Sequence, residues 1–275
     1  ADGHELTRVR QPTPRGDYKA TLGCIQQLVL ETERALGSRG SVGVGVPGAL
    51  SPASGLIKNA NSTWCIGKPL DRDLGALLGR EIRVANDANC LAVSESVDGA
   101  AAGADCLFAV ILGTGVGGGI AFSGRPWTGR HAIAGEWGHN PLPWPSVEEL
   151  QETTCYCGKH SCIEMFLSGP GFTAQFARTT GEVLTPDAIV ARALGGDAVA
   201  TVVWEDYLDR LARALAQVIN ILDPDAIVLG GGVSNLNPLY EEIPRRLGGY
   251  EFSDVCDTPI LRAAHGDSSG VRGAA

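Results

Sequence analysis

Residues 106–124 constrain the fold more than any other part of the chain, because they join strand-forming residues to a run of glycines. This stretch carries no charged side chain, and six of its 19 residues are glycine. A membrane helix needs about 20 apolar residues, but Val110-Ile111-Leu112 followed by glycine fits a strand entering a turn better. We therefore expect a strand, a glycine turn and a second strand through Ile120-Ala121-Phe122, in a chain that does not enter a membrane.

The whole chain is rich in glycine and acidic. It has 37 glycines in 275 residues and a formal net charge of −9. The glycines follow no Gly-X-Y period and lie among apolar residues, which excludes collagen and flexible linkers. The negative charge argues against binding to nucleic acid or to anionic membranes.

Strand and helix signals alternate over the first hundred residues, which is typical of an α/β fold. Asp17 is predicted to cap a helix whose apolar residues recur at helical spacing. Those residues are Leu22, Ile25, Leu28, Val29 and Leu36. Strands are predicted at 41–46 and 82–85, the second between a helix from Asp71 and a helix reaching about Ala102. The pattern changes at 103–106, where we expect a domain boundary.

Gly113-Thr-Gly-Val-Gly-Gly118 has the spelling G-x-G-x-x-G of a dinucleotide site. Such a site opens a helix, whereas a strand follows here, so the dinucleotide interpretation is disfavoured. A glycine turn between two strands can instead wrap backbone N–H groups around a phosphate. The alternative is a tight hairpin without a ligand.

Asn86-Asp87 follows one strand and precedes a helix. In an α/β sheet the carboxyl end of a strand is where ligands bind. Asp87 can act there as a general base toward a substrate hydroxyl or bind Mg²⁺. An ordinary helix N-cap explains an aspartate at this position equally well.

Three cysteines gather within eight residues, and a histidine precedes them. His139, Cys155, Cys157 and Cys162 would complete the tetrahedral shell of a structural zinc ion. A disulfide with one spare thiol is one rival, and His160 in place of His139 is another, although His160 lies only two residues before Cys162. The remaining cysteines are dispersed, which fits small buried residues in a cytoplasmic protein with one metal site.

Acidic residues lie close to this cluster in the sequence. Glu136 precedes His139 by three residues, and Glu164 follows Cys162 by two. If the metal draws them together, two carboxylates with Asn61 and Asp87 would suit a polyhydroxylated ligand. The alternative for each glutamate is an ordinary surface position.

Several motifs together identify a family that the chain resembles. They are Val84-Ala-Asn-Asp-Ala-Asn89, Gly113-Thr-Gly-Val-Gly-Gly-Gly119, Ala134-Gly-Glu-Trp-Gly-His139, Cys155-Tyr-Cys-Gly-Lys-His-Ser-Cys-Ile-Glu164, Asp223-Pro-Asp-Ala-Ile-Val-Leu-Gly-Gly-Gly232 and His265-Gly-Asp-Ser-Ser-Gly270. They resemble the ROK family of bacterial sugar kinases, in the superfamily of sugar kinases, heat-shock chaperones and actin. Residues 58–64 and 137–144 look most like the fructokinase/mannokinase branch, with N-acetylglucosamine kinase as the nearest competitor and glucokinase as a further alternative.

The resemblance implies two actin-like, ribonuclease H-like domains, at residues 1–104 and 105–275, with a zinc-binding loop at about 139–164. It implies an ATP-dependent kinase acting on fructose or mannose, in which Asp87 takes the proton of the sugar 6-hydroxyl and Mg²⁺ bridges the phosphates. It also implies a cytoplasmic protein whose partners are a hexose and ATP, and it leaves a homodimer open.

The resemblance also assigns binding roles. The residues implied to hold sugar hydroxyls are Asn61, Asn86, Glu136, His139 and Glu164. Gly113, Thr114 and Gly115 would cradle phosphate, and Gly231 and Gly232 would let the nucleoside approach. Zinc on His139, Cys155, Cys157 and Cys162 would make the sugar site rigid, with the second ring nitrogen of His139 turned to the sugar.

Two departures from the family pattern matter. Ser161 stands where the family has glycine, so the backbone there has to adapt. The family's opening strand and Asp-x-Gly-Gly-Thr turn are absent, and Leu6 to Val9 reads as the strand that would follow them. We therefore expect a chain trimmed at both ends, with little or no kinase activity on its own. Two other hypotheses are a ROK-type transcriptional repressor and a non-catalytic, zinc-stabilised binding module.

Overall fold

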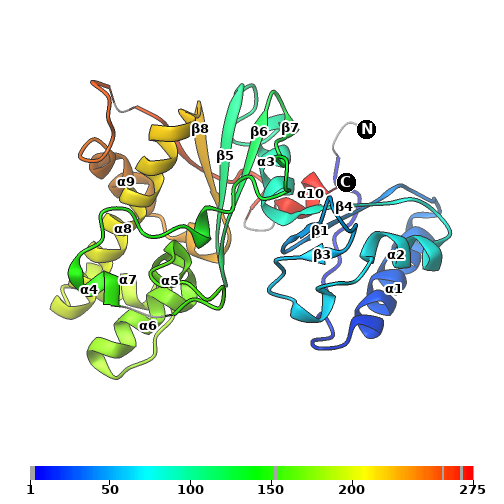
Figure 1. Ribbon diagram of the computed structural model, residues 1–275, viewed down its shortest axis with the longest axis horizontal. Helices are drawn as coiled ribbons and strands as arrows, with labels where there is room; N and C mark the ends of the chain where they lie inside the picture. The colour runs from blue at the N-terminus through cyan, green and yellow to red at the C-terminus, as the bar shows by residue number, and fades with distance from the viewer. Residues whose placement is uncertain (1–3, 152–153, 256, 267–268, 275) are drawn as a thin grey trace. The chain divides into compact units, whose positions relative to one another are not determined.

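The computed structural model describes residues 4–151, 154–255, 257–266 and 269–274. Its internal contacts form two compact units, shown in Figure 1. The first comprises the residues up to Asp87 together with Arg130–Ala132, and the second comprises Ala88–Gly129 and Ile133–Gly273. The domain boundary at residues 104 and 105 stays a prediction. No helix in the described ranges is both long enough and apolar enough for a membrane crossing.

The first unit contains two helices and two pairs of strands. They are α1 (Tyr18–Leu36), β1 (Val42–Val46), β2 (Ala49–Leu50), β3 (Ile57–Lys58), the 3-10 helix η1 (Thr63–Cys65), α2 (Leu70–Leu78) and β4 (Ile82–Asn86). β1 and β4 run parallel, with Val46 opposite Asn86, while β2 and β3 pair antiparallel. Leu22 of α1 and Leu70, Leu74 and Leu78 of α2 supply most of the core over these strands.

The start of α1 confirms one prediction, and the segment before it corrects another. Asp17 caps the helix, because its Oδ1 accepts a hydrogen bond from the Ala20 N–H at 3.0 Å. The predicted strand from Leu6 to Val9 is wrong: residues 4–14 form neither helix nor strand, and these two side chains are 72% and 57% exposed. An isolated apolar run has no strand preference of its own without a neighbouring strand and a core to pack on.

The second unit is built on a five-stranded sheet in the order β7-β6-β5-β8-β9. Its strands are β5 (Cys106–Leu112), β6 (Val116–Phe122), β7 (Arg125–Pro126), β8 (Ala226–Gly230) and β9 (Ile260–Arg262). β5 is antiparallel to β6 and parallel to β8. The strand, glycine turn and strand predicted from residues 106–124 are therefore confirmed.

Helices cover both faces of this sheet, as an α/β fold requires (Figure 1). The helices after β4 are α3 (Asp87–Val97), η2 (Trp137–His139), α4 (Val147–Gln151), α5 (Ile163–Leu167), α6 (Gly169–Thr180), α7 (Pro186–Leu194), α8 (Ala198–Leu222), η3 (Gly232–Asn235), α9 (Leu239–Leu247) and α10 (Gly270–Gly273). Alternate residues of β5 point to opposite faces. Phe108 and Val110 join the core formed with α5–α9, while Leu107 and Ala109 pack with Leu91 of α3.

The glycines of β6 allow α3 to approach the sheet closely. A Cβ added to Gly119 would lie 2.2 Å from the carbonyl oxygen of Ala88, at the start of α3. One added to Gly118 would lie 2.7 Å from a ring carbon of Trp137. These two glycines of the run thus serve packing within the protein, whereas we expected the run to face a ligand.

Replacing Gly119 with alanine is expected to lower the free energy of unfolding by about 1–3 kcal/mol, as in other overpacked sites. The added methyl group would force the start of α3 away from β6. Gly117→Ala is the matched control on the same strand, since its Cβ would meet the Cβ atoms of Ala88 and Ile111 at ordinary distances of 3.6 and 3.9 Å. Chemical denaturation of both variants checks this, and equal midpoints would rule out the close approach as a constraint.

Candidate functional site

Hydrogen bonds from Glu164 of α5 and Gly169 of α6 hold the glycine turn between β5 and β6. The N–H of Gly113 donates to the carbonyl of Gly115 at 3.0 Å, and the N–H of Gly169 donates to the carbonyl of Gly113 at 2.8 Å. Oε2 of Glu164 accepts the N–H of Val116 at 2.9 Å. A Cβ on Gly115 would lie 2.6 Å from the same oxygen. A side chain at position 115 would therefore displace the Glu164 carboxylate from its place beside the turn.

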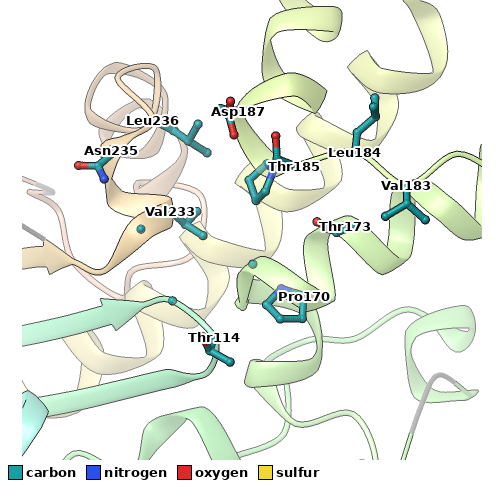
Figure 2. A pocket seen from close by; sticks show the side chains of 14 residues that line it. Thr114, Pro170, Thr173, Val183, Leu184, Thr185, Asp187, Val233, Asn235 and Leu236 are labelled. Atoms are coloured by element: carbon teal, nitrogen blue, oxygen red, sulfur yellow. The ribbon is translucent and has the colours of Figure 1, made fainter. Parts of the chain in front are cut away.

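A cavity of about 850 Å³ opens beside this turn, within the second unit (Figure 2). Its walls come from the turn, the first residues of α6, the segment 183–187 and η3. The lining residues are Gly113, Thr114, Gly169, Pro170, Thr173, Val183, Leu184, Thr185, Pro186, Asp187, Gly232, Val233, Asn235 and Leu236. Most of the wall is apolar, with a few polar groups, which is typical of sites for small organic ligands.

Three of the five residues implied to contact the nucleotide line this cavity: Gly113, Thr114 and Gly232. Gly115 and Gly231 are not among the lining residues. Gly231 has φ of +82°, and a Cβ there would lie 2.5 Å from the carbonyl oxygen of Leu112. It therefore brings η3 against the end of β5 and shapes the cavity indirectly.

Sequence reasoning missed the walls supplied by α6, by the segment 183–187 and by η3. The starts of the two helices are visible in the sequence, as Ser168-Gly-Pro-Gly171 and as Thr185 followed by Pro186. Proline in the first turn of a helix is a common start signal, and it stands second in α6 and first in α7. That both starts face the glycine turn depends on tertiary packing, which the local pattern does not contain.

The four predicted zinc ligands come together in the second unit. Their ligand atoms all lie within 4.8 Å of one another. Nδ1 of His139 is 3.6 Å from the Cys155 sulfur, and the sulfurs of Cys157 and Cys162 are 3.6 Å apart. Tetrahedral zinc with sulfur ligands at about 2.3 Å would hold these sulfurs about 3.8 Å apart. The donor set and its spacing thus fit zinc.

The rival interpretations of the cluster receive no support from the geometry. His160 is not a member of the cluster, and its Nδ1 lies 3.5 Å from the hydroxyl of Thr154 instead. Cys155, Cys157 and Cys162 are free thiols. His139 is therefore the histidine placed to complete the shell.

Zinc binding can be tested directly. Purified, reduced protein is expected to bind one equivalent of zinc, and Cys157→Ser is expected to bind it far more weakly, because a hydroxyl replaces a thiolate ligand.

The affinity for zinc should also depend on pH. Burial, and then the hydrogen bond with Cys157, raises the pKa of the Cys162 thiol to about 12. Zinc must displace this proton, so affinity should increase with pH. Metal analysis and chelator competition measure both; less than one equivalent in the wild-type protein would contradict the zinc site.

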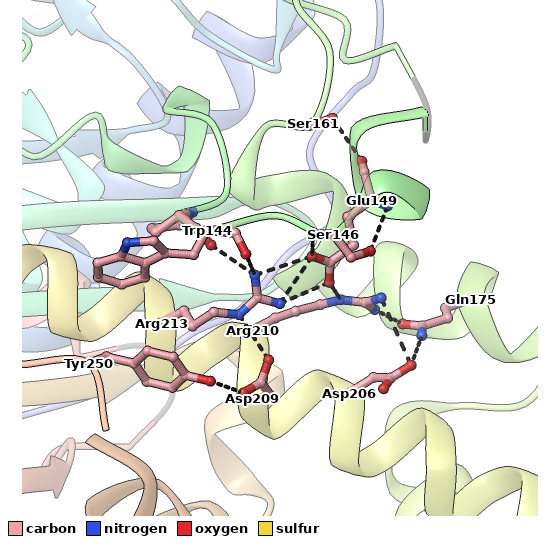
Figure 3. Close-up of polar contacts among 11 residues, drawn as sticks. Trp144, Ser146, Glu149, Ser161, Gln175, Asp206, Asp209, Arg210, Arg213 and Tyr250 are labelled. Atoms are coloured by element: carbon pink, nitrogen blue, oxygen red, sulfur yellow. Dashed lines mark hydrogen bonds and ion pairs between the residues drawn. The ribbon is translucent and has the colours of Figure 1, made fainter. Parts of the chain in front are cut away.

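The backbone before the last ligand adopts the left-handed conformation. Ser161 has φ of +55°, a region that glycine enters without strain. Its hydroxyl donates to the carbonyl oxygen of Glu149 in α4 at 2.9 Å (Figure 3). A backbone adaptation relative to the family stays a prediction, and the hydroxyl fastens the cysteine loop to α4.

A buried ion cluster holds α4 in turn on the long helix α8. The Glu149 carboxylate accepts from Nε of Arg210 at 2.6 Å and from the Arg213 guanidinium at 2.9 Å (Figure 3). It also accepts the Ser146 N–H at 2.9 Å, at the start of α4. Neither arginine nor the cluster figured in the sequence analysis.

The two glutamates close to the cysteine cluster in sequence, Glu136 and Glu164, lie in, or directly before, elements that contact each other. Glu136 directly precedes η2, Glu164 lies in the first turn of α5, and η2 contacts α5. Nε2 of His139 lies 2.9 Å from the hydroxyl of Tyr156. Burial, followed by the charges of Glu164, Cys155 and Glu136, raises the pKa of Tyr156 to about 12. The second ring nitrogen of His139 thus has a partner that sequence reasoning did not include.

In the first unit, the predicted catalytic residue lies at the end of a strand. Asp87 follows β4 directly and is the first residue of α3. The side-chain amide of Asn86 donates to the carbonyl of Gly48 at 3.1 Å. Asn61 precedes η1, and its Oδ1 lies 3.4 Å from the Ser62 hydroxyl. The roles of Asn61, Asn86 and Asp87 stay predictions.

Comparison with known proteins decides the family. A model of the ROK family matches residues 1–275. The chain is 41% identical over 270 residues to an N-acetyl-D-glucosamine kinase of Escherichia coli O1:K1, across 97% of this chain and 89% of that protein. The chain belongs to the ROK family. The resemblance drawn from the motifs is therefore confirmed.

Solved structures of ROK proteins show the same fold. A ROK hexokinase from Thermus thermophilus is 28% identical with a TM-score of 0.85, covering 100% of this chain and 91% of that one. A ROK glucokinase from Streptomyces griseus, in complex with glucose and AMPPNP, is 27% identical with a TM-score of 0.80, covering 99% and 91%. The predicted α/β sugar kinase fold is confirmed. In the last motif, Asp267 and Ser268 lie outside the described residues.

Proposed function

We propose that this ROK protein is an ATP-dependent hexose kinase whose preferred sugar is N-acetylglucosamine, phosphorylated at its 6-hydroxyl. The observation that carries this proposal is the 41% identity with an N-acetyl-D-glucosamine kinase over 97% of the chain. This similarity favours the alternative of the sequence analysis over fructose and mannose. Glucose is the second candidate, because the Streptomyces griseus relative is a glucokinase.

The cavity in the second unit supports the nucleotide part of the proposal. Its apolar walls suit a flat base, and the backbone of Gly113 and Thr114 at one side suits phosphates. The Streptomyces griseus glucokinase binds AMPPNP, an ATP analogue. Mg²⁺ would bridge the phosphates of ATP and neutralise charge during transfer.

The sugar part of the proposal rests on side chains that accept or donate hydrogen bonds. Asn61, Asn86, Glu136, His139 and Glu164 would hold the sugar hydroxyls. Asp87 would accept the proton of the 6-hydroxyl as its oxygen attacks the γ-phosphorus. In-line transfer of this kind depends mainly on positioning and on neutralising charge.

Zinc would hold the histidine and the cysteine loop rigid when bound to the cluster of His139, Cys155, Cys157 and Cys162. The loop then keeps Glu164 in place, since this glutamate follows Cys162 by two residues and bonds to the glycine turn. A cytoplasmic location and assembly as a homodimer stay predictions. The mass of the protein in solution tests the second.

Release of ADP from ATP, with a panel of sugars, tests the proposal. The complete open reading frame that encodes these residues is expected to have its highest kcat/KM with N-acetylglucosamine. Fructose is expected to be poorer by about tenfold or more, the discrimination that pocket shape supplies. A preference for fructose or mannose would instead support the fructokinase or mannokinase activity that the sequence motifs favoured. No turnover with any hexose would rule out the kinase and leave the repressor or the binding module.

A further inference from the structure

Tyr156 lies between two of the predicted zinc ligands, Cys155 and Cys157. Its ring meets the His139 ring edge-on, with centroids 5.1 Å apart and planes at 88°. The phenol oxygen lies 2.9 Å from Nε2 of His139. The residue as a whole is 68% exposed. A large aromatic side chain in an exposed turn is thus held by one histidine nitrogen.

We propose that Tyr156 is a positioning residue for the zinc site: its oxygen accepts the Nε2 hydrogen of His139 and fixes the histidine tautomer. A neutral imidazole carries one hydrogen, on either nitrogen. With that hydrogen on Nε2, the lone pair of Nδ1 is free to face the thiols, the nearest being the Cys155 sulfur at 3.6 Å. The inference rests on the zinc site described under the proposed function.

Metal-bound histidines commonly donate their second ring N–H to an acceptor, which fixes the ring and strengthens the ligand. With its oxygen 2.9 Å from Nε2, the phenol of Tyr156 is placed to be such an acceptor. Its own hydrogen is then available for an oxygen of the sugar. Nε2 of His139 would then reach a sugar hydroxyl through Tyr156, and it would contact the sugar directly only when the sugar takes the place of the Tyr156 oxygen.

Tyr156→Phe tests this inference, because it keeps the ring and removes only the acceptor. Zinc affinity, measured on the complete protein by competition with a chromogenic chelator, is expected to fall by about tenfold. The KM for the sugar is expected to increase by a larger factor than kcat decreases. Tyr18→Phe is the matched control: Tyr18 donates a hydrogen bond to Asp73 at 2.8 Å in the first unit, and its loss should leave zinc affinity unchanged.

A second measurement reads the tautomer itself. Nitrogen NMR of the zinc-free wild-type protein is expected to show the His139 hydrogen on Nε2, and Tyr156→Phe is expected to show a mixture. A hydrogen on Nδ1 in the wild-type protein would overturn the inference, as would unchanged zinc affinity in Tyr156→Phe. Zinc affinity and tautomer are measured without sugar or ATP. They therefore test Tyr156 separately from kinase activity.

Discussion

Asp87→Asn is expected to lower kcat for sugar phosphorylation by about 10²- to 10⁴-fold, the usual contribution of a general base. Asparagine has nearly the shape of aspartate but cannot take the proton of the 6-hydroxyl. The fold should be unaffected, because the position begins α3 directly after β4 and asparagine is accepted at helix starts. Steady-state kinetics with ATP and N-acetylglucosamine measure the change.

The same variant separates the interpretations that the sequence left open for Asp87. If the carboxylate only stabilised the start of α3, asparagine would do so equally well and kcat would stay near the wild-type value. If the carboxylate bound Mg²⁺, extra Mg²⁺ would recover much of the lost rate. Asp105→Asn, at an exposed aspartate just before β5, is the control expected to keep full activity.

Glu149→Ala is expected to lower the free energy of unfolding by about 3–5 kcal/mol, the usual cost of breaking a buried ion pair. Glu149 is 6% exposed and lies between two arginines that are similarly buried, Arg210 and Arg213 (Figure 3). Without the carboxylate, two guanidinium groups lose their principal partner in the protein interior. Asp209 still pairs with Arg213 at 2.9 Å, which places the loss at the lower end of the range.

Glu148→Ala is the matched control for this variant. Glu148 is the preceding residue on the same helix but is exposed, so its removal should leave the unfolding midpoint unchanged. Chemical denaturation of the two variants and the wild type compares them under one set of conditions. Equal midpoints for Glu148→Ala and Glu149→Ala would contradict a stabilising role for the cluster.

The Glu149 carboxylate should also make the free energy of unfolding depend on pH in a definite direction. Burial raises its pKa, but the hydrogen bonds from Arg213 and Arg210 outweigh this and lower the pKa from 4.5 to about 2. A carboxylate whose pKa is lower in the folded than in the unfolded protein stabilises the fold at pH values above its unfolded pKa. This stabilisation is lost as the pH falls toward 2. The stability gap between the wild type and Glu149→Gln should therefore shrink from pH 5 downward. A gap that stays constant would exclude ionised Glu149 as its cause.

Features set by neighbours in the sequence could be predicted. The Asp17 cap, the strand before Asp87 and the hairpin around Gly113 each depend on a few adjacent residues, and the structure has all three. The grouping of His139 with the three cysteines was predictable for a different reason, since thiolates and imidazole have few other uses at such spacing. The strand predicted from Leu6 to Val9 was wrong, because strand formation depends on a neighbouring strand and a core to pack on.

Features that join distant segments could not be predicted. The cavity walls come from η3 and from the starts of α6 and α7, and Glu149 meets Arg213 across 64 positions of the chain. The preferred sugar could not be predicted from the motifs either, because the same hydroxyl-binding residues serve several hexoses and discrimination depends on pocket shape. Relatives at high identity supply that information better than motifs do.

Phosphorus NMR of a single reaction tests the central claim most directly. The complete protein is mixed with ATP, Mg²⁺ and N-acetylglucosamine, and the spectrum is followed with time. We predict that the γ-phosphate signal of ATP is replaced by that of ADP together with a phosphomonoester coupled to the two hydrogens on carbon 6 of the sugar. Unchanged ATP, or inorganic phosphate without a sugar phosphate, would contradict the account.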